Sequence, residues 1–134
     1  MGTVLDHTIV PVRNQEEAIE FYTRILGFED GGTGGMTGLF AVAKINDSSA
    51  LDFLLSNHIS NPGHYAFAME PEQFAKSFQR IKEAGIPYGD DPEIPTNMRG
   101  PGKSIGTKGY TQSVYFNDPS GHLLEIITYP KRPT

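Results

Sequence analysis

The sequence contains two similar halves, and this repeat constrains the fold more than any other feature. Each half begins with a short β-forming run that carries a histidine, continues with a helical pattern of about three turns, and then reaches a glycine. His7 and His64 lie 57 positions apart, and the glycines Gly27 and Gly85 lie 58 apart. A duplicated βαβββ unit accounts for this order of elements.

Both halves also end in a hairpin whose turn is rich in Asn, Asp, Ser or Gly, the residues that favour tight turns. Asn46 aligns with Asn117 at an offset of 71, and Asp52 aligns with Glu125 at an offset of 73. The polar connection 87–111 absorbs the difference in length. A connection this long in a compact domain is more often functional than idle.

The repeat predicts an α+β fold. Two tandem βαβββ modules, residues 4–56 and 63–129, would form a single domain of residues 1–134, in which the first and last strands of each module converge on one cleft. Inside the modules, Asn14 is expected to cap a helix ended by Gly27, and Pro71 to open a second helix. Strands are expected at 5–12, 39–45, 50–55, 64–69, 114–116 and 123–127. The glycine-rich stretch 31–38 lacks the lysine of a phosphate-binding loop, so we expect a mobile connection or lid.

Composition excludes several classes of function. The 134 residues carry a net charge of −5 without a run of Lys or Arg, which argues against nucleic acid and anionic membranes as partners. No cysteine is present, so disulfides, thiol catalysis and Cys-ligated metals are excluded. No run of about 18 apolar residues could span a bilayer, and the N-terminus does not resemble a signal peptide. A cytoplasmic protein fits these observations.

Two carboxylates stand in otherwise apolar strands. Glu125 and Asp52 would be costly there as ions unless something positive pairs with them. The repeat places them at equivalent positions, and it does the same for His7 and His64. Two imidazoles with one or two carboxylates are a suitable ligand set for a divalent first-row metal. A bound metal would neutralise Glu125.

Four segments, in this order, resemble the vicinal oxygen chelate superfamily. They are Leu-Asp-His at 5–7, Phe-Tyr-x-x-Ile-Leu-Gly-Phe at 21–28, Gly-His-Tyr-Ala-Phe at 63–67 and Asp-Pro-Ser-Gly-His-Leu-Leu-Glu at 118–125. The superfamily comprises glyoxalase I, fosfomycin-resistance proteins, bleomycin-resistance proteins and extradiol dioxygenases. The resemblance covers nearly the whole chain.

This resemblance implies a metal site and a mechanism. The matching positions His7, His64 and Glu125 would bind Fe, Mn, Ni, Co or Zn. The fold would be a single glyoxalase-like domain, in which the two βαβββ modules form a paired half-barrel with a metal cleft, and the protein would be a homodimer. The small-molecule substrate would chelate the metal through neighbouring oxygens, and the metal would act as a Lewis acid. Asp52 or Glu125 would move a proton, so both are candidate catalytic residues.

Departures from the pattern leave the reaction open. Glyoxalase I has a glutamate ligand where this chain has Asp52, and fosfomycin-resistance enzymes have a catalytic threonine where it has Ile9. Extradiol dioxygenases also need a second-sphere histidine several residues before the tyrosine that matches Tyr115, and residues 105–112 contain none. Bleomycin-binding members lack the metal triad that this chain has. We therefore expect a lyase or isomerase of glyoxalase type, with an Fe(II) ring-cleaving dioxygenase and a non-catalytic small-molecule binder as the alternatives.

Further candidates come from the same comparison. Tyr115 could donate a hydrogen bond to a metal-bound oxygen or simply pack, and Ser113 matches a position that lines the pocket in fosfomycin-resistance enzymes. His122 is expected to be solvated in its turn. Basic residues of the long connection could bind the acidic part of a substrate: Arg99, Lys103 and Lys108.

Overall fold

The structure is a computed structural model that describes residues 2–130. The chain divides into two compact units, the first ending at Pro62 and the second beginning at Gly63. We call the elements of the first unit module 1 and those of the second unit module 2. Within the described residues, no helix is both long and apolar enough to cross a membrane.

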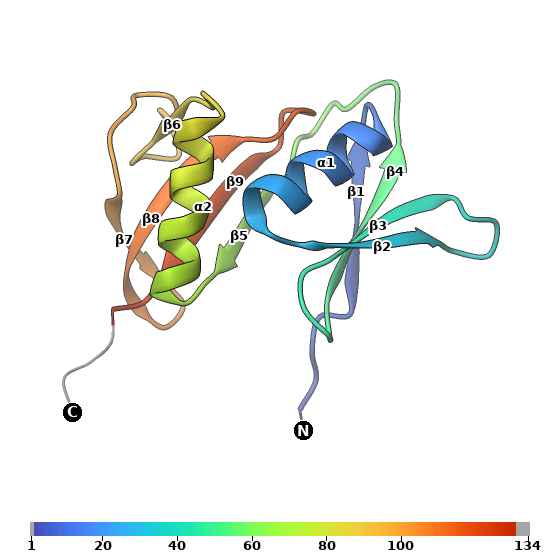
Figure 1. The fold of residues 1–134 in the computed structure, drawn as a ribbon, viewed down its shortest axis with the longest axis horizontal. Coiled ribbons are helices and arrows are strands. Elements are labelled where there is room, and N and C mark those ends of the chain that lie inside the picture. The colour runs from blue at the N-terminus through green and yellow to red at the C-terminus, as the bar shows by residue number, and fades with distance from the viewer. Residues whose placement is uncertain (1, 131–134) are drawn as a thin grey trace. The chain divides into compact units, whose positions relative to one another are not determined.

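Module 1 is one helix on one four-stranded sheet. Its elements are β1 (His7–Val12), α1 (Gln15–Leu26), β2 (Glu29–Gly34), β3 (Phe40–Lys44) and β4 (Ala50–Leu55). The sheet order is β1-β4-β3-β2, in which β1 runs parallel to β4 and the other neighbours are antiparallel. The helix α1 packs against this sheet (Figure 1).

Module 2 repeats this plan with one additional strand. Its elements are β5 (His64–Ala68), α2 (Pro71–Glu83), β6 (Tyr88–Gly89), β7 (Gly102–Gly106), β8 (Gly109–Asn117) and β9 (Leu123–Thr128). The order is β5-β9-β8-β6, with β7 also paired to β8, and β5 runs parallel to β9. Two mixed sheets with one helix each confirm the predicted α+β class.

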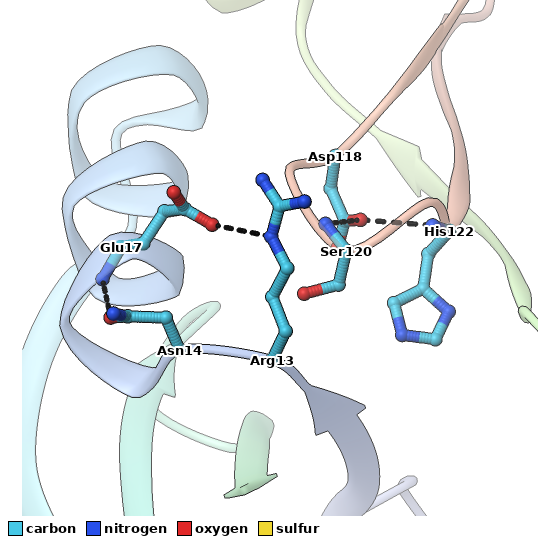
Figure 2. A network of polar contacts seen from close by, with 6 residues as sticks. All are labelled: Arg13, Asn14, Glu17, Asp118, Ser120 and His122. Atoms are coloured by element: carbon cyan, nitrogen blue, oxygen red, sulfur yellow. Dashed lines mark hydrogen bonds and ion pairs between the residues drawn. The ribbon is translucent and has the colours of Figure 1, made fainter. Parts of the chain in front are cut away.

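Local sequence explains both helices. The Asn14 side chain accepts a hydrogen bond from the Glu17 backbone N–H at 2.8 Å (Figure 2), and Gly27 ends α1 with a φ of 75° that suits glycine. The proline Pro71 occupies the first turn of α2, where no N–H is needed. The apolar positions of α1 are all buried against the sheet, as expected: Ala18, Phe21, Tyr22, Ile25 and Leu26.

The strand register shows that the modules are equivalent. In both, the ligand-type histidine opposes the residue two positions before the carboxylate. Side chains two apart on a strand share a face. Asp52 therefore shares a face with the histidine of module 1, and Glu125 with that of module 2. The opposed pairs are His7 with Ala50 and His64 with Leu123.

The register corrects one alignment made from sequence. Lys44 is paired with Ala50, and Asn117 is paired with Leu123, both two residues before the ligand-type carboxylate of β4 or β9. Asn117 is therefore equivalent to Lys44, at an offset of 73, and its alignment with Asn46 was wrong by two positions. The two Asn-Asp dipeptides resemble each other because both start turns, but they stand at different places in their hairpins.

The glycine-rich stretch 31–38 is not the mobile lid that its composition predicts. Its first half belongs to β2, which pairs with β3 and has an irregularity between Asp30 and Thr33. A Cβ on Gly34 would lie only 2.8 Å from a methyl carbon of Val42. The glycine is therefore required because the neighbouring strand packs closely, not because the segment must move.

The connection 87–111 is also more ordered than predicted. It contains β6, β7 and the beginning of β8, which leaves 90–101 as its irregular part. β6 and β7 pair with successive parts of β8, so together they form one interrupted edge strand. The interruption is closed by the Asn97 side-chain amide, which donates to the Asp90 carboxylate at 2.7 Å.

Candidate functional site

The partner of Glu125 in the structure is His64. The two residues lie on the adjacent parallel strands β9 and β5, and the His64 Nε2 is 3.2 Å from the Glu125 Oε1. The Glu125 side chain is only 12% exposed and that of His64 is 47% exposed. A nitrogen and a carboxylate oxygen at this separation would suit two neighbouring ligands of one divalent ion.

Tyr115 is directly opposite Glu125 on the neighbouring strand β8. Its ring is buried, stands edge-on to the His64 ring with centroids 6.4 Å apart, and its hydroxyl donates to the Ser104 Oγ at 3.4 Å. Burial raises the pKa of the Tyr115 phenol, and the charge of Glu125 raises it further. The phenol therefore remains a hydrogen-bond donor at neutral pH.

The other predicted pocket residues of module 2 differ in their burial and in the sheet face that they occupy. Ser113 lies two residues before Tyr115, on the same face, and is fully buried with its Oγ 2.9 Å from the Thr111 Oγ1. Lys103 opposes Gln112, so it lies on the other face of the sheet. Arg99 is exposed in the irregular segment 90–101.

Lys108 occupies the exposed turn between β7 and β8. Its ammonium stands 5.8 Å from the centre of the Tyr129 ring, close enough for a cation–π contact, and its backbone N–H donates to the Tyr129 hydroxyl at 3.4 Å. These contacts account for the position of Lys108 without a substrate. Its role in binding an anion stays a prediction.

His7 opens β1 in module 1 and is surrounded by carboxylates. Its Nδ1 lies 2.7 Å from the Asp6 Oδ2. The hydrogen bond with Asp6 raises the His7 pKa, and the negative charge of Asp52 adds to the increase. A carboxylate on Nδ1 is the usual support for a histidine that binds metal through Nε2, so this side chain also fits a metal ligand.

A pocket of about 230 Å³ adjoins His7 within module 1. It is lined by Asp6, His7, Lys44, Asn46, Asp47, Ser48, Ser49, Ala50 and Asp52. Lys44 is a candidate that sequence analysis missed. Lys44 is the last residue of β3, in which Phe40, Val42 and Lys44 lie on the same face. Pairing of β3 with β4 places Lys44 diagonally across from Asp52. Both strands of this hairpin were predicted from sequence, but the register that brings Lys44 close to Asp52 was not.

His122 contradicts its prediction. We expected a solvated side chain, yet it is completely buried. Its Nδ1 accepts a hydrogen bond from the Gly63 backbone N–H at 2.8 Å, and its ring meets the Tyr65 ring edge-on at 5.6 Å. Turn position alone misleads here because the chain beside the turn supplies a partner 59 residues away.

The structure thus forms two pairs of candidate residues. His64 and Glu125 lie together in module 2, and His7 shares a sheet face with Asp52 in module 1. In residues 2–130, no group of three His, Asp or Glu side chains is arranged to hold a metal. The triad of His7, His64 and Glu125 therefore stays a prediction.

Comparison with known proteins identifies the family. Residues 4–126 match the model of the Glyoxalase/Bleomycin resistance protein/Dioxygenase superfamily. One relative is metallothiol transferase FosB of Shouchella clausii (strain KSM-K16), which is 27% identical over 128 residues, or 92% of this chain and 79% of that protein.

Solved structures of the same fold include two proteins named as oxidases. Oxidase ChaP-H2 is 35% identical, with a TM-score of 0.78 over 97% of this chain and 96% of that one. Oxidase ChaP-H1 is 32% identical, with a TM-score of 0.76 over 96% of this chain and 98% of that one. The chain therefore belongs to the glyoxalase/bleomycin resistance protein/dioxygenase superfamily, as its motifs suggested.

Proposed function

We propose that this protein is a divalent-metal-dependent enzyme that acts on a small molecule bound through neighbouring oxygen atoms. His7, His64 and Glu125 would hold a first-row metal. The observation that carries the proposal is the 3.2 Å approach of His64 Nε2 to Glu125 Oε1 on adjacent strands. The superfamily includes metal-dependent enzymes, of which the metallothiol transferase relative is one by its name.

Each residue then has a chemical task. The metal would supply Lewis acidity to the substrate oxygens. Tyr115, protonated and beside Glu125, would donate a hydrogen bond to a substrate oxygen. Asp52 would hold or accept a proton. Lys44 would orient an acidic group, a task that the sequence had assigned to the basic residues of 87–111.

Two reactions are consistent with this site. Oxidation is supported by the two relatives named as oxidases and by the donor set of two histidines and one carboxylate, which suits ferrous iron. The absence of histidine from 105–112 counts against extradiol ring cleavage only. A lyase or isomerase reaction of glyoxalase type is supported by Asp52, a half-buried carboxylate on the His7 face of the sheet. A homodimer in the cytoplasm remains our expectation for either reaction, with the two modules forming a single domain.

Metal content and oxygen uptake test these proposals. Protein purified without chelator should contain stoichiometric metal, and His64→Ala should lose it, whereas His58→Ala should not, because His58 is an exposed loop residue. Oxygen uptake by the iron-loaded protein with catechols and related phenols would support oxidation, and turnover of hemithioacetals without oxygen would support the lyase. Metal-free protein that binds small molecules equally well would instead indicate the non-catalytic binder.

A further inference from the structure

His122 is a buried histidine that has no part in the predicted metal triad. It stands in the turn between β8 and β9, yet none of its surface is exposed. The Asp118 carboxylate holds this turn, because its Oδ1 accepts the backbone N–H groups of Ser120 and His122, both at 2.9 Å (Figure 2). The Asp118 N–H donates in return to the His122 carbonyl at 2.9 Å. The turn is thus fixed at the residue that carries the imidazole.

The imidazole of His122 is bonded to the residue that precedes His64. Its Nδ1 accepts the N–H of Gly63 at 2.8 Å, and the N–H of Leu123 donates to the Gly63 carbonyl at 2.9 Å. A backbone N–H can only donate, so Nδ1 is unprotonated and the neutral ring carries its proton on Nε2. The consecutive residues His122 and Leu123 therefore hold both polar groups of Gly63.

Gly63 is also confined on its side-chain face. A Cβ at this position would lie 2.6 Å from the hydroxyl oxygen of Tyr65 and 2.7 Å from two of its ring carbons. The Tyr65 ring in turn rests edge-on against the His122 ring. A side chain at position 63 would therefore displace the Tyr65 ring, which contacts the His122 imidazole.

We propose that His122 is a positioning residue that sets where β5 begins, so that the His64 imidazole meets the Glu125 carboxylate at ligand distance. The proposal rests on the proposed function, since it takes His64 and Glu125 as metal ligands. Its physical basis is the short distance along the chain between the His122–Gly63 hydrogen bond and the two ligands. Gly63 is adjacent to His64, and His122 is three residues before Glu125, so the bond between them joins the two strands close to both ligands.

Three variants test this role with cobalt(II) as the probe, measured by calorimetry and visible absorption. His122→Leu removes the acceptor and should weaken cobalt(II) binding about 10- to 100-fold, the range for residues that support metal ligands. His122→Asn places an oxygen near the position of Nδ1 and should restore most of the affinity. The control Ile81→Val truncates a fully buried residue of α2 in the same module and should lower the Tm without changing cobalt(II) affinity.

Each outcome decides one question. Wild-type affinity in a folded His122→Leu variant overturns the positioning role and leaves the metal enzyme intact, whereas no cobalt(II) binding by the wild type overturns the proposed function itself. If His122→Leu does not fold, His122→Gln is tested in its place, because the glutamine amide would occupy the position of Nε2 and not that of Nδ1. Nitrogen chemical shifts of the metal-free protein must also show the Nε2–H tautomer, and an Nδ1–H tautomer would contradict the bond to Gly63.

Discussion

The two modules have the same strand register but different side chains on the candidate face. Module 1 presents His7, supported by Asp6, beside a polar pocket that contains Lys44. Module 2 presents His64 against a largely buried Glu125, with the buried Tyr115 on the next strand. The repeat therefore preserves the strand pairing, whereas the side chains on the candidate face differ between the modules.

The same contrast appears where the first and last strands of each module join. The Ser49 hydroxyl donates to the Leu5 carbonyl at 2.7 Å, whereas the His122 imidazole accepts from the Gly63 N–H at 2.8 Å. Both residues directly precede the strand that carries the carboxylate. The adjoining backbone bonds are equivalent and both measure 2.9 Å: Ala50 N–H to Asp6 O, and Leu123 N–H to Gly63 O. One junction thus uses a side-chain donor and the other a side-chain acceptor.

The largest expected effects concern the two cores. Phe53 and Ile126 are fully buried at equivalent positions of β4 and β9, and the Phe53 ring lies 4.9 Å from the Tyr22 ring. Phe53→Ala should lower the free energy of unfolding by about 3–5 kcal/mol, and Ile126→Ala by about 2–5 kcal/mol, because each leaves a cavity. Urea unfolding measures both. Leu55→Ala, at the exposed end of β4, should change stability by less than about 0.5 kcal/mol, and a larger change there would contradict its exposure.

The second prediction compares the equivalent carboxylates as metal ligands. Glu125→Gln should weaken binding of a divalent metal at least about 100-fold, because loss of a ligand should cost more than loss of its support. Asp52→Asn should change metal affinity less and lower kcat about 10²- to 10⁴-fold, as expected for a group that moves a proton. Calorimetry and steady-state kinetics separate the two effects. Equal losses of metal affinity in both variants would make Asp52 a fourth ligand and not a base.

Local patterns predicted the elements of this fold better than their partners. The helix α1 follows from short-range periodicity, and the equivalence of His64 and Glu125 to His7 and Asp52 follows from the repeat. The strand β2 was missed because its glycines, such as Gly34, have low β-propensity and form a strand only by pairing with β3.

The candidate site was predictable where a charge was out of place, and not otherwise. Glu125 and Asp52 are conspicuous in apolar strands, so they could be identified from sequence. Lys44 and His122 stand where polar residues are ordinary, at a strand end and in a turn. The importance of Lys44 depends on the hairpin register, which places it diagonally from Asp52, and that of His122 depends on Gly63, 59 residues away in sequence.

The third prediction addresses the junction of module 1. Ser49→Ala removes the hydrogen bond to the Leu5 carbonyl and should lower the free energy of unfolding by about 1 kcal/mol. The bond is solvent-exposed, so water can replace the lost donor, and the effect on metal affinity should be smaller than that of His122→Leu. Thermal unfolding and cobalt(II) titration measure the two quantities. If Ser49→Ala weakened metal binding as much as His122→Leu, the junctions would be equally important for the ligands.

The fourth prediction compares Lys44, which lines the pocket of module 1, with Lys103, which lies exposed on strand β7 of module 2. Lys44→Met should raise KM for an acidic substrate about three- to fivefold, the effect of losing one partly exposed ion pair. Lys103→Met should leave KM unchanged, because Lys103 lies on the sheet face opposite to Ser113 and Tyr115. A neutral analogue of the same substrate is the control and should not distinguish Lys44→Met from the wild type. A larger increase of KM in Lys103→Met than in Lys44→Met would instead indicate an anion site in the 87–111 segment.

The smallest expected effect is a pH dependence confined to module 2. Burial raises the pKa of the Tyr65 phenol, and the negative charge of Asp118 adds to the increase, while Thr8 occupies the equivalent position of module 1 and does not titrate. Tyrosine in the unfolded chain loses its proton at a pKa of about 10, whereas Tyr65 in the folded state keeps its proton to a higher pH. The stabilisation is therefore fully present below pH about 10 and is lost as the pH rises through the folded pKa. Denaturant midpoints measured on both sides of this pH should show the fall, and Tyr65→Phe should reduce it. An unchanged fall in Tyr65→Phe would assign the alkaline loss to other groups, such as Tyr115 of the same module, whose pKa is also raised.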